Sequence, residues 1–464
     1  MGRESSRAFG LWSAVFLGIG SMVGAGIFIV IGEAGAIAGN LVWLSFVLGG
    51  LVALFSGYSL ARLALRYPSR GGIIEYLVQT YGEGVFSGSA GILFYLAGLI
   101  AIAAVAKSFG EYLAVLTHLH THFWINTFAV GVVALFTLIN LLGAALVAKS
   151  ENAIVVIKLT VLVLFTGAAL WTVDPALLGT AKMPPMMDML YAIGLTFFAY
   201  QGFSVITNTV EDMEDPAHNM LRAMIITILL VAALYILTSI AVLGNLPLPD
   251  VIRAKDYALA EAAKPIFGTL GFKVMAVTAL IATASAINAT LYATTQISYT
   301  LAKEGNLPKI YEYNIFRSSE GLVVSALLIV PMILFMNLGQ ITTVAALVVL
   351  IVQGVVHLGH LLKIRETGAS RPLIMAAVLL SFGVAILTLA YTRHKMPDVP
   401  YYLLGAFAFA FFAEVILRFI NGRIVRRQFL LEEDRLLKKI EEEVLKRFSL
   451  QRGKRRDTDP ASGS

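Results

Sequence analysis

The chain has 464 residues, of which 58% are hydrophobic and only 14% are charged, whereas a soluble domain carries about 25% charged residues. Its formal net charge is +6, but the Lys and Arg residues lie in loops and in the C-terminal tail, so nucleic acid is not expected as a partner. The sequence contains no cysteine, which excludes disulfides and a thiol nucleophile.

Apolar segments recur along the chain, and each is long enough to cross about 30 Å of hydrocarbon as a helix. Transmembrane β-strands would instead alternate apolar and polar residues in segments of about ten. The first segment continues past Ala34 without an A-x-A-like cleavage site, so we expect a retained helix. The sequence therefore predicts an all-α integral membrane protein with twelve transmembrane helices, at 9–38, 41–66, 84–116, 123–143, 150–172, 187–211, 219–244, 272–303, 320–336, 340–364, 371–392 and 400–421.

The loops predict the orientation of the chain. An even number of crossings puts both termini on one side, and the loops there are richer in Lys and Arg than the opposite loops. By the positive-inside rule, we expect a multi-pass protein of the cell membrane with cytoplasmic N- and C-termini. Residues 1–8 are the predicted N-terminal segment. In residues 422–464 we expect a cytoplasmic amphipathic helix, followed by a disordered tail.

The first span contains a cluster of glycines near its middle. Gly18, Gly20, Gly24 and Gly26 fall within nine residues, and each glycine costs a helix about 1 kcal/mol relative to alanine. If the helix unwinds here, the released N–H and C=O groups must line an enclosed cavity or meet a ligand. The half-helix that begins near Gly26 directs its positive end at the break, where a carboxylate is stabilised. The alternative is close helix packing through small residues.

The sixth span carries a second interruption, at Phe198–Ser204, where Gly and polar residues break an apolar helix. Two breaks placed five spans apart indicate two inverted five-helix repeats, here 9–172 and 187–364, with a binding site at their interface. Residues 371–421 form the eleventh and twelfth helices. Carbonyls released at the breaks would meet an ammonium, and amides of the first would meet a carboxylate. These two demands describe a zwitterionic amino acid.

Lys158 stands out in the fifth span, roughly 12 Å from its cytoplasmic end at 1.5 Å per residue. An ammonium in the centre of a membrane helix costs about 2.5–3.5 kcal/mol, so we expect it to face the bundle and to be functional. An enclosed lysine can gain and lose a proton during a transport cycle. Ser285 in the eighth span could accept a hydrogen bond from it. The alternative is a lysine that extends its head group to the membrane surface.

Histidines give weaker signals. The short loop that holds His118, His120 and His122 has no acidic partner, so we expect no metal site, and no cofactor motif is present in the sequence. His357 and His360, near the inner end of the tenth span, could titrate, but we expect them to be simply hydrogen-bonded.

Several motifs resemble those of one transporter family. The segment Gly20–Phe28 resembles the first-helix signature of the amino acid–polyamine–organocation transporters. Further matches follow in order at Pro68–Gly72, Glu211–Pro216 and Leu301–Pro308, so the resemblance covers about residues 8–425. With Lys158, the chain is most similar to the archaeal proton-dependent amino acid transporter branch. The resemblance implies a LeuT-type fold, with two inverted five-helix repeats and two additional helices.

The resemblance also implies roles for residues at the two breaks. The substrate carboxylate would be held by the amides of Val23, Gly24, Ala25 and Gly26. The ammonium would be held by the carbonyls of Ile19, Met22, Phe198 and Gln201, and the Phe198 ring would cover the substrate. Proton coupling would involve Lys158, Gly20 and Ser285. Ala25 stands where many members of the family have serine, which removes one hydroxyl contact.

The sequence thus predicts a secondary active amino acid transporter that works by proton-coupled symport and alternating access. Its expected partners are an amino acid, protons and the lipid bilayer. Two alternatives stay open: an amino-acid-binding receptor that does not transport, and a sodium-coupled or exchanging transporter. We do not expect an enzyme, because the sequence places no nucleophile, metal cluster or carboxylate pair at membrane depth. The oligomeric state is not predicted.

Overall fold

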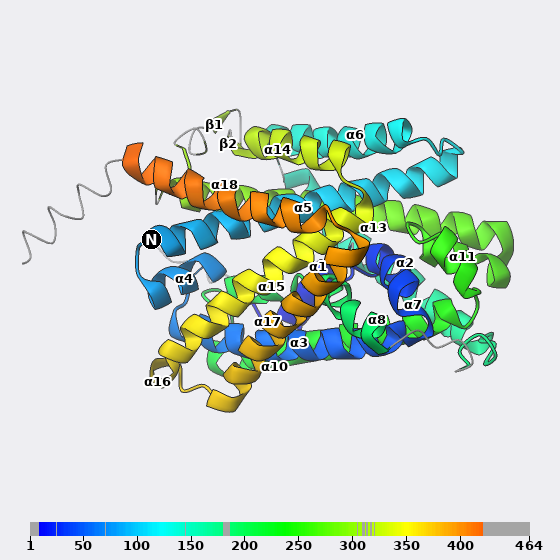
Figure 1. The fold of residues 1–464 in the computed structure, drawn as a ribbon, viewed down its shortest axis with the longest axis horizontal. Coiled ribbons are helices and arrows are strands. Elements are labelled where there is room, and N and C mark those ends of the chain that lie inside the picture. The colour runs from blue at the N-terminus through cyan, green and yellow to red at the C-terminus, as the bar shows by residue number, and fades with distance from the viewer. Residues whose placement is uncertain are drawn as a thin grey trace, which may run out of the picture.

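The computed structural model describes residues 9–24, 26–69, 71–143, 145–179, 186–303, 305–308, 311, 314–315, 318–319 and 321–420. Long helices fill most of this chain and form one bundle (Figure 1). The predicted N-terminal segment 1–8 and the predicted amphipathic helix and tail at 422–464 lie outside the described residues.

The elements follow one another in chain order. They are α1 (Leu11–Met22), α2 (Gly26–Ala38), η1 (Gly39–Leu41), α3 (Val42–Arg66), α4 (Ile73–Tyr81), α5 (Val85–Thr117), α6 (His122–Gly143), α7 (Ala145–Trp171), α8 (Met186–Tyr191), α9 (Ile193–Ala199), η3 (Phe203–Thr209), α10 (Pro216–Leu243), α11 (Leu248–Arg253), α12 (Ala258–Glu261), α13 (Lys264–Lys303), β1 (Asn314–Ile315), β2 (Ser318–Ser319), α14 (Gly321–Phe335), α15 (Leu338–Leu362), α16 (Ile364–Thr367), α17 (Arg371–Lys395) and α18 (Val399–Ile420).

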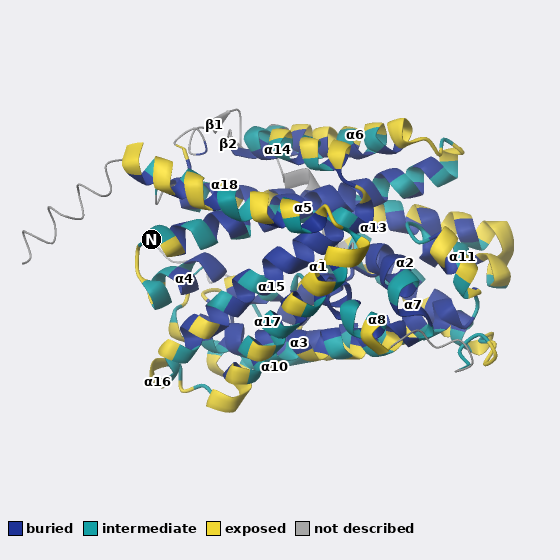
Figure 2. Cartoon of the chain, in the orientation of Figure 1, coloured by how far each residue is buried: buried dark blue, intermediate teal, exposed yellow. Residues whose placement is uncertain are grey.

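Helices occupy every predicted span. Within the described residues, ten segments are long and apolar enough to cross a membrane, and α1 and α14 are shorter apolar helices. Large apolar side chains cover the outside of the bundle, such as Trp171 and Phe419, which are 92% and 78% exposed. Exposed residues line the outer sides of α6 and α18, whereas α15 is mostly buried (Figure 2). An apolar exterior of this kind suits a lipid environment.

Some elements differ from the predicted ones. The eighth span was predicted to begin at residue 272, but α13 already begins at Lys264, with a kink at Gly268, whose φ is +65°. The short helices α4, α11, α12 and α16 connect the long ones and were not predicted. The helices α11, α12 and α16 have six, four and four residues, too few to show a helical period of apolar residues.

The two interrupted spans run in opposite directions through the bundle. The first half of one packs against the second half of the other, since α1 contacts η3 and α2 contacts α9. The start of the first span is also tied to the end of the sixth. The Phe9 N–H donates to the Asp212 carbonyl at 2.9 Å, and the Glu214 N–H donates to the Phe9 carbonyl at 3.1 Å. This antiparallel arrangement brings the two breaks together.

Candidate substrate site

The two helix breaks touch each other through glycines. The first lies between Met22 and Gly26, and the second between Ala199 and Phe203. Gly202 has φ +120°, and a Cβ there would lie 2.7 Å from the Ser21 Oγ and 2.9 Å from the Ser21 carbonyl carbon. A Cβ at Gly26 would overlap the carbonyl oxygen of Ala199. Only glycine permits this approach, so the glycines bring the two breaks into contact.

Tyr235 of α10 holds both breaks at once. Its fully buried hydroxyl donates to the Met22 carbonyl at 2.7 Å and lies 3.2 Å from the Ala199 carbonyl. The Phe46 ring packs edge-on against it, with 5.7 Å between ring centroids. The hydroxyl satisfies backbone oxygens that the unwound turns release in an apolar interior. Sequence reasoning missed this residue, because a single tyrosine in an apolar helix does not reveal its partner.

The predicted carbonyl ligands lie at the ends of α1 and α9. The Ile19 carbonyl accepts the Val23 N–H at 2.8 Å, the Met22 carbonyl accepts from Tyr235, and the Phe198 carbonyl accepts the Gln201 N–H at 3.0 Å. The Phe198 carbonyl also accepts the Tyr200 N–H, which uses both of its lone pairs. The Ile19 and Met22 carbonyls each have one hydrogen bond here, and their contact with an ammonium stays a prediction.

The predicted amide donors lie between the end of α1 and the start of α2, and the Val23 N–H already donates to the Ile19 carbonyl at 2.8 Å. Val23, Gly24 and Gly26 are buried, and Ala25 lies outside the described residues. The first N–H groups of a helix have no partner within that helix, and together they favour an anion. The Phe198 side chain is only 6% exposed, on the opposite break. The predicted carboxylate donors therefore belong to the first break, and the aromatic ring predicted to cover the substrate belongs to the second break, which is in contact with the first.

Lys158 reaches the first break from α7. Its Nζ donates to the Gly20 carbonyl at 2.9 Å, and the residue is only 1% exposed. A Cβ built on Gly24 would lie 3.7 Å from the same Nζ and 3.0 Å from the Ala286 Cβ of α13. The first break is therefore lined by both α7 and α13. Ser285, the residue before Ala286, is buried, and its contact with Lys158 stays a prediction.

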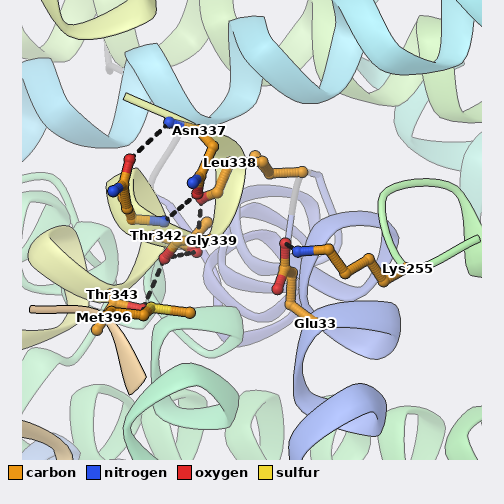
Figure 3. Close-up of polar contacts among 9 residues, drawn as sticks. Glu33, Lys255, Asn337, Leu338, Gly339, Thr342, Thr343 and Met396 are labelled. Carbon is orange, nitrogen blue, oxygen red and sulfur yellow. Dashed lines mark hydrogen bonds and ion pairs between the residues drawn. The ribbon is translucent and has the colours of Figure 1, made fainter. Parts of the chain in front are cut away.

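A buried ion pair lies on the second half of the first span. Glu33 of α2 is 2% exposed, and its Oε1 accepts from the Lys255 Nζ at 2.9 Å, as Figure 3 shows. A Cβ on Gly339, in the first turn of α15, would lie 3.1 Å from both carboxylate oxygens. The positive end of α15 favours this anion. Glu33 thus joins α2, the α11–α12 connection and α15. Sequence reasoning also missed this contact.

Comparisons with known proteins agree with this architecture. The family model described as amino acid permease matches residues 9–425. An uncharacterized protein of Methanocaldococcus jannaschii is 34% identical, over 90% of this chain and 97% of that relative. The inner membrane transport protein YbaT of Escherichia coli is 35% identical, over 83% and 90% respectively. The serine/threonine exchanger SteT of Bacillus subtilis is 28% identical, over 65% and 69%.

The fold and the matches define a multi-pass α-helical membrane protein whose named relatives are permeases and transporters. The chain belongs to the amino acid permease family, within the amino acid–polyamine–organocation superfamily, and the predicted family is thereby confirmed.

The packing of Gly26 on Ala199 generates a direct test. Gly26→Val adds three carbons where even one would overlap the Ala199 carbonyl, so the breaks must separate. We expect amino acid binding to weaken by roughly 5- to 150-fold, the equivalent of about 1–3 kcal/mol for overpacking. Gly131→Val on α6 is the control, since a Cβ there meets nothing within 4 Å. Native affinity in a monodisperse Gly26→Val protein would mean that the glycine serves packing alone.

Proposed function

We propose that this permease carries amino acids by proton-coupled symport, through a site formed by the two breaks. The observation that supports this most is the contact of the breaks at Gly26 and Ala199, with Tyr235 bonded to one and close to the other. Unwound backbone in a membrane protein is found where it lines a site or cavity, and paired broken helices mark the substrate site of many transporters.

The site would recognise the part that all amino acids share. The amides of residues 24–26 would bind the carboxylate, with help from the positive end of α2, since the predicted Val23 N–H is bonded to the Ile19 carbonyl. The carbonyls of Ile19, Met22 and Gln201 would bind the ammonium. Backbone groups read these constant groups and leave the side chain to the surrounding residues. We therefore propose a selectivity set mainly by the free α-ammonium and α-carboxylate.

Alternating access would follow from the antiparallel broken spans. The contacts of α1 with η3 and of α2 with α9 support a LeuT-type arrangement of two inverted repeats, with α17 and α18 as additional helices. The Glu33–Lys255 pair would hold the α11–α12 connection over the second half of the first span and would part when that side opens. We further propose a place in the cell membrane with both termini cytoplasmic, from the distribution of Lys and Arg.

Lys158 would couple transport to protons. Its ammonium donates to the Gly20 carbonyl, so a charged lysine holds α7 against the first break. A neutral amine is a weaker donor and would release that contact. Protonation from outside would thus favour the outward-facing arrangement, and loss of the proton to the cytoplasm would favour inward opening. Ser285 would be a second partner of the ammonium.

Exchange is the second candidate mechanism. The relative named serine/threonine exchanger SteT supports it, since exchange and symport can use the same site. The third candidate is a different function, that of a receptor that binds an amino acid without transporting it. Uptake into liposomes that contain only this protein would show transport, which a receptor does not perform. Uptake into liposomes without internal substrate would indicate symport, because an exchanger needs a substrate molecule inside.

The backbone-lined site predicts which molecules compete for it. N-acetyl-alanine lacks the ammonium and alanine amide lacks the carboxylate, so each leaves buried polar groups unpaired and should lose several kcal/mol of binding, roughly 1–3 per group. We expect alanine to displace labelled alanine, with both analogues failing at the same concentration. Equal competition by either analogue would contradict the proposed site.

The role of Lys158 predicts a specific loss of pH response. Uptake should rise with an inward proton gradient and be indifferent to sodium, and Lys158→Ala should bind substrate but lose this pH dependence. Lys107→Ala is the matched control, because this second buried lysine bonds Asn126 and the Ile333 carbonyl, not a break. The measurement is labelled uptake into liposomes over a pH series. A sodium requirement in the native protein, or an unchanged profile in Lys158→Ala, would refute the assignment.

A further inference from the structure

A continuous chain of buried hydroxyl and imidazole groups joins α3 to α15. The His357 Nε2 lies 2.9 Å from the Ser56 Oγ, and its Nδ1 lies 2.9 Å from the Ser59 Oγ. The same Ser59 Oγ lies 2.8 Å from the His360 Nδ1, and the His360 Nε2 lies 2.8 Å from the Thr367 Oγ1. Both serines and both histidines are fully buried. We call these five residues the imidazole chain.

The hydrogen bonds of the imidazole chain all point the same way. We assign the Thr367 hydroxyl as the donor to the Ile364 carbonyl, and in this assignment it accepts from the Nε2–H of His360. A neutral imidazole has one donor and one acceptor, which makes the His360 Nδ1 an acceptor for Ser59. Ser59 then accepts from the Nδ1–H of His357, whose Nε2 accepts from Ser56. Every group therefore donates toward Thr367, with both histidines neutral.

The chain begins one helical turn from the second break. Gln353, four residues before His357 on α15, is fully buried, and its Nε2 lies 3.4 Å from the Gln201 Oε1. Within the described part of the protein, the Gln353 Oε1 and the Gln201 Nε2 have no hydrogen-bond partner. Two unpartnered amide groups at this position suit a water molecule between the break and Ser56.

The chain ends near the surface that carries α4 and α16, at the left of Figure 1. Thr367 is half-buried, and the neighbouring Glu366 is exposed. Hydrogen bonds from the Tyr67 hydroxyl and the Lys363 ammonium hold the pKa of Glu366 below its usual range. Glu366 is therefore a carboxylate at neutral pH, and it keeps negative charge beside the end of the chain.

Within the described residues, few other charged groups face the imidazole chain, and Arg66 of α3 pairs with Glu366 at 3.8 Å. The guanidinium of Arg62, one turn after Ser59 on α3, is the cation whose charge acts on His360. From α4, the Tyr81 hydroxyl donates to the Val355 carbonyl. Glu414 and Arg418 of α18, another helix against α15, pair with each other.

We propose that the imidazole chain is the path by which the coupled proton leaves the region of the breaks for the face that carries α4 and α16. The inference rests on the proposed proton coupling. A proton delivered by water binds the Ser56 oxygen while the Ser56 proton moves to the His357 Nε2. The His357 Nδ1 proton moves to Ser59, the Ser59 proton to the His360 Nδ1, and the His360 Nε2 proton to Thr367. Thr367 releases its proton to water, so one proton enters and one leaves.

The test separates proton movement from substrate movement. Ser59→Ala removes the central hydroxyl, and His360→Gln keeps a donor and an acceptor but cannot pass a proton through a ring. Ser45→Ala is the matched control, since this buried serine of α3 donates only to the Met189 carbonyl in the structure. Each protein is placed in liposomes with an internal pH dye. Uptake driven by a pH gradient, substrate-evoked proton flux, and counterflow of labelled against unlabelled alanine at equal pH are measured.

We expect driven uptake and proton flux to fall by about tenfold or more in Ser59→Ala and His360→Gln, since a positioned proton-transfer group contributes that much or more. Counterflow, which needs no net proton movement, should match the native protein, and Ser45→Ala should be unchanged in every assay. Unchanged proton flux in both chain variants overturns the proposal, as does an equal fall in flux and counterflow, which indicates a structural role. If the native protein itself shows no substrate-evoked proton flux, the proposed coupling fails as well.

Discussion

The structure depends on one constraint, which is that backbone groups released inside an apolar bundle must find partners. Two spans unwind, and each break supplies part of what the other needs. Gly26 and Gly202 let the turns approach each other, while the Tyr235 hydroxyl and the Lys158 ammonium bond carbonyls of the first break. The remaining backbone groups at the breaks are the proposed binding site for a zwitterion.

Buried charged side chains elsewhere in the bundle also have hydrogen-bonding partners. Glu33 meets Lys255 and the first turn of α15, and Glu414 accepts two hydrogen bonds from Arg418. The Glu33–Lys255 pair joins α2 to the α11–α12 connection, whereas the Glu414–Arg418 pair lies within α18, four residues apart. The imidazole chain differs from these pairs because it is neutral, directional and continuous. A chain with that property can move a proton without leaving a net charge in the membrane interior.

Much of this fold could be predicted from the sequence, because a membrane helix is recognisable from the composition of a long apolar segment. The glycine cluster at Gly18–Gly26 predicted the first break, and the polar interruption at Phe198–Ser204 predicted the second. Tyr235 and Glu33 were not predicted as parts of the site, since their partners are distant backbone and loop atoms that no local pattern encodes. His357 and His360 were noted, but their alignment with Ser56 and Ser59 depends on how α15 packs against α3. Helix packing, rather than periodicity, determines these contacts.

The most direct test of the account is an experimental structure of the protein with bound alanine, compared with the same protein without it. The account predicts density between the two breaks, with the carboxylate within hydrogen-bond distance of the amides of residues 24–26. The ammonium should lie beside the carbonyls of Ile19 and Met22, under the Phe198 ring. Alanine bound away from both breaks, or bound there through side chains with its ammonium and carboxylate exposed to water, would contradict the claim that the unwound backbone is the substrate site.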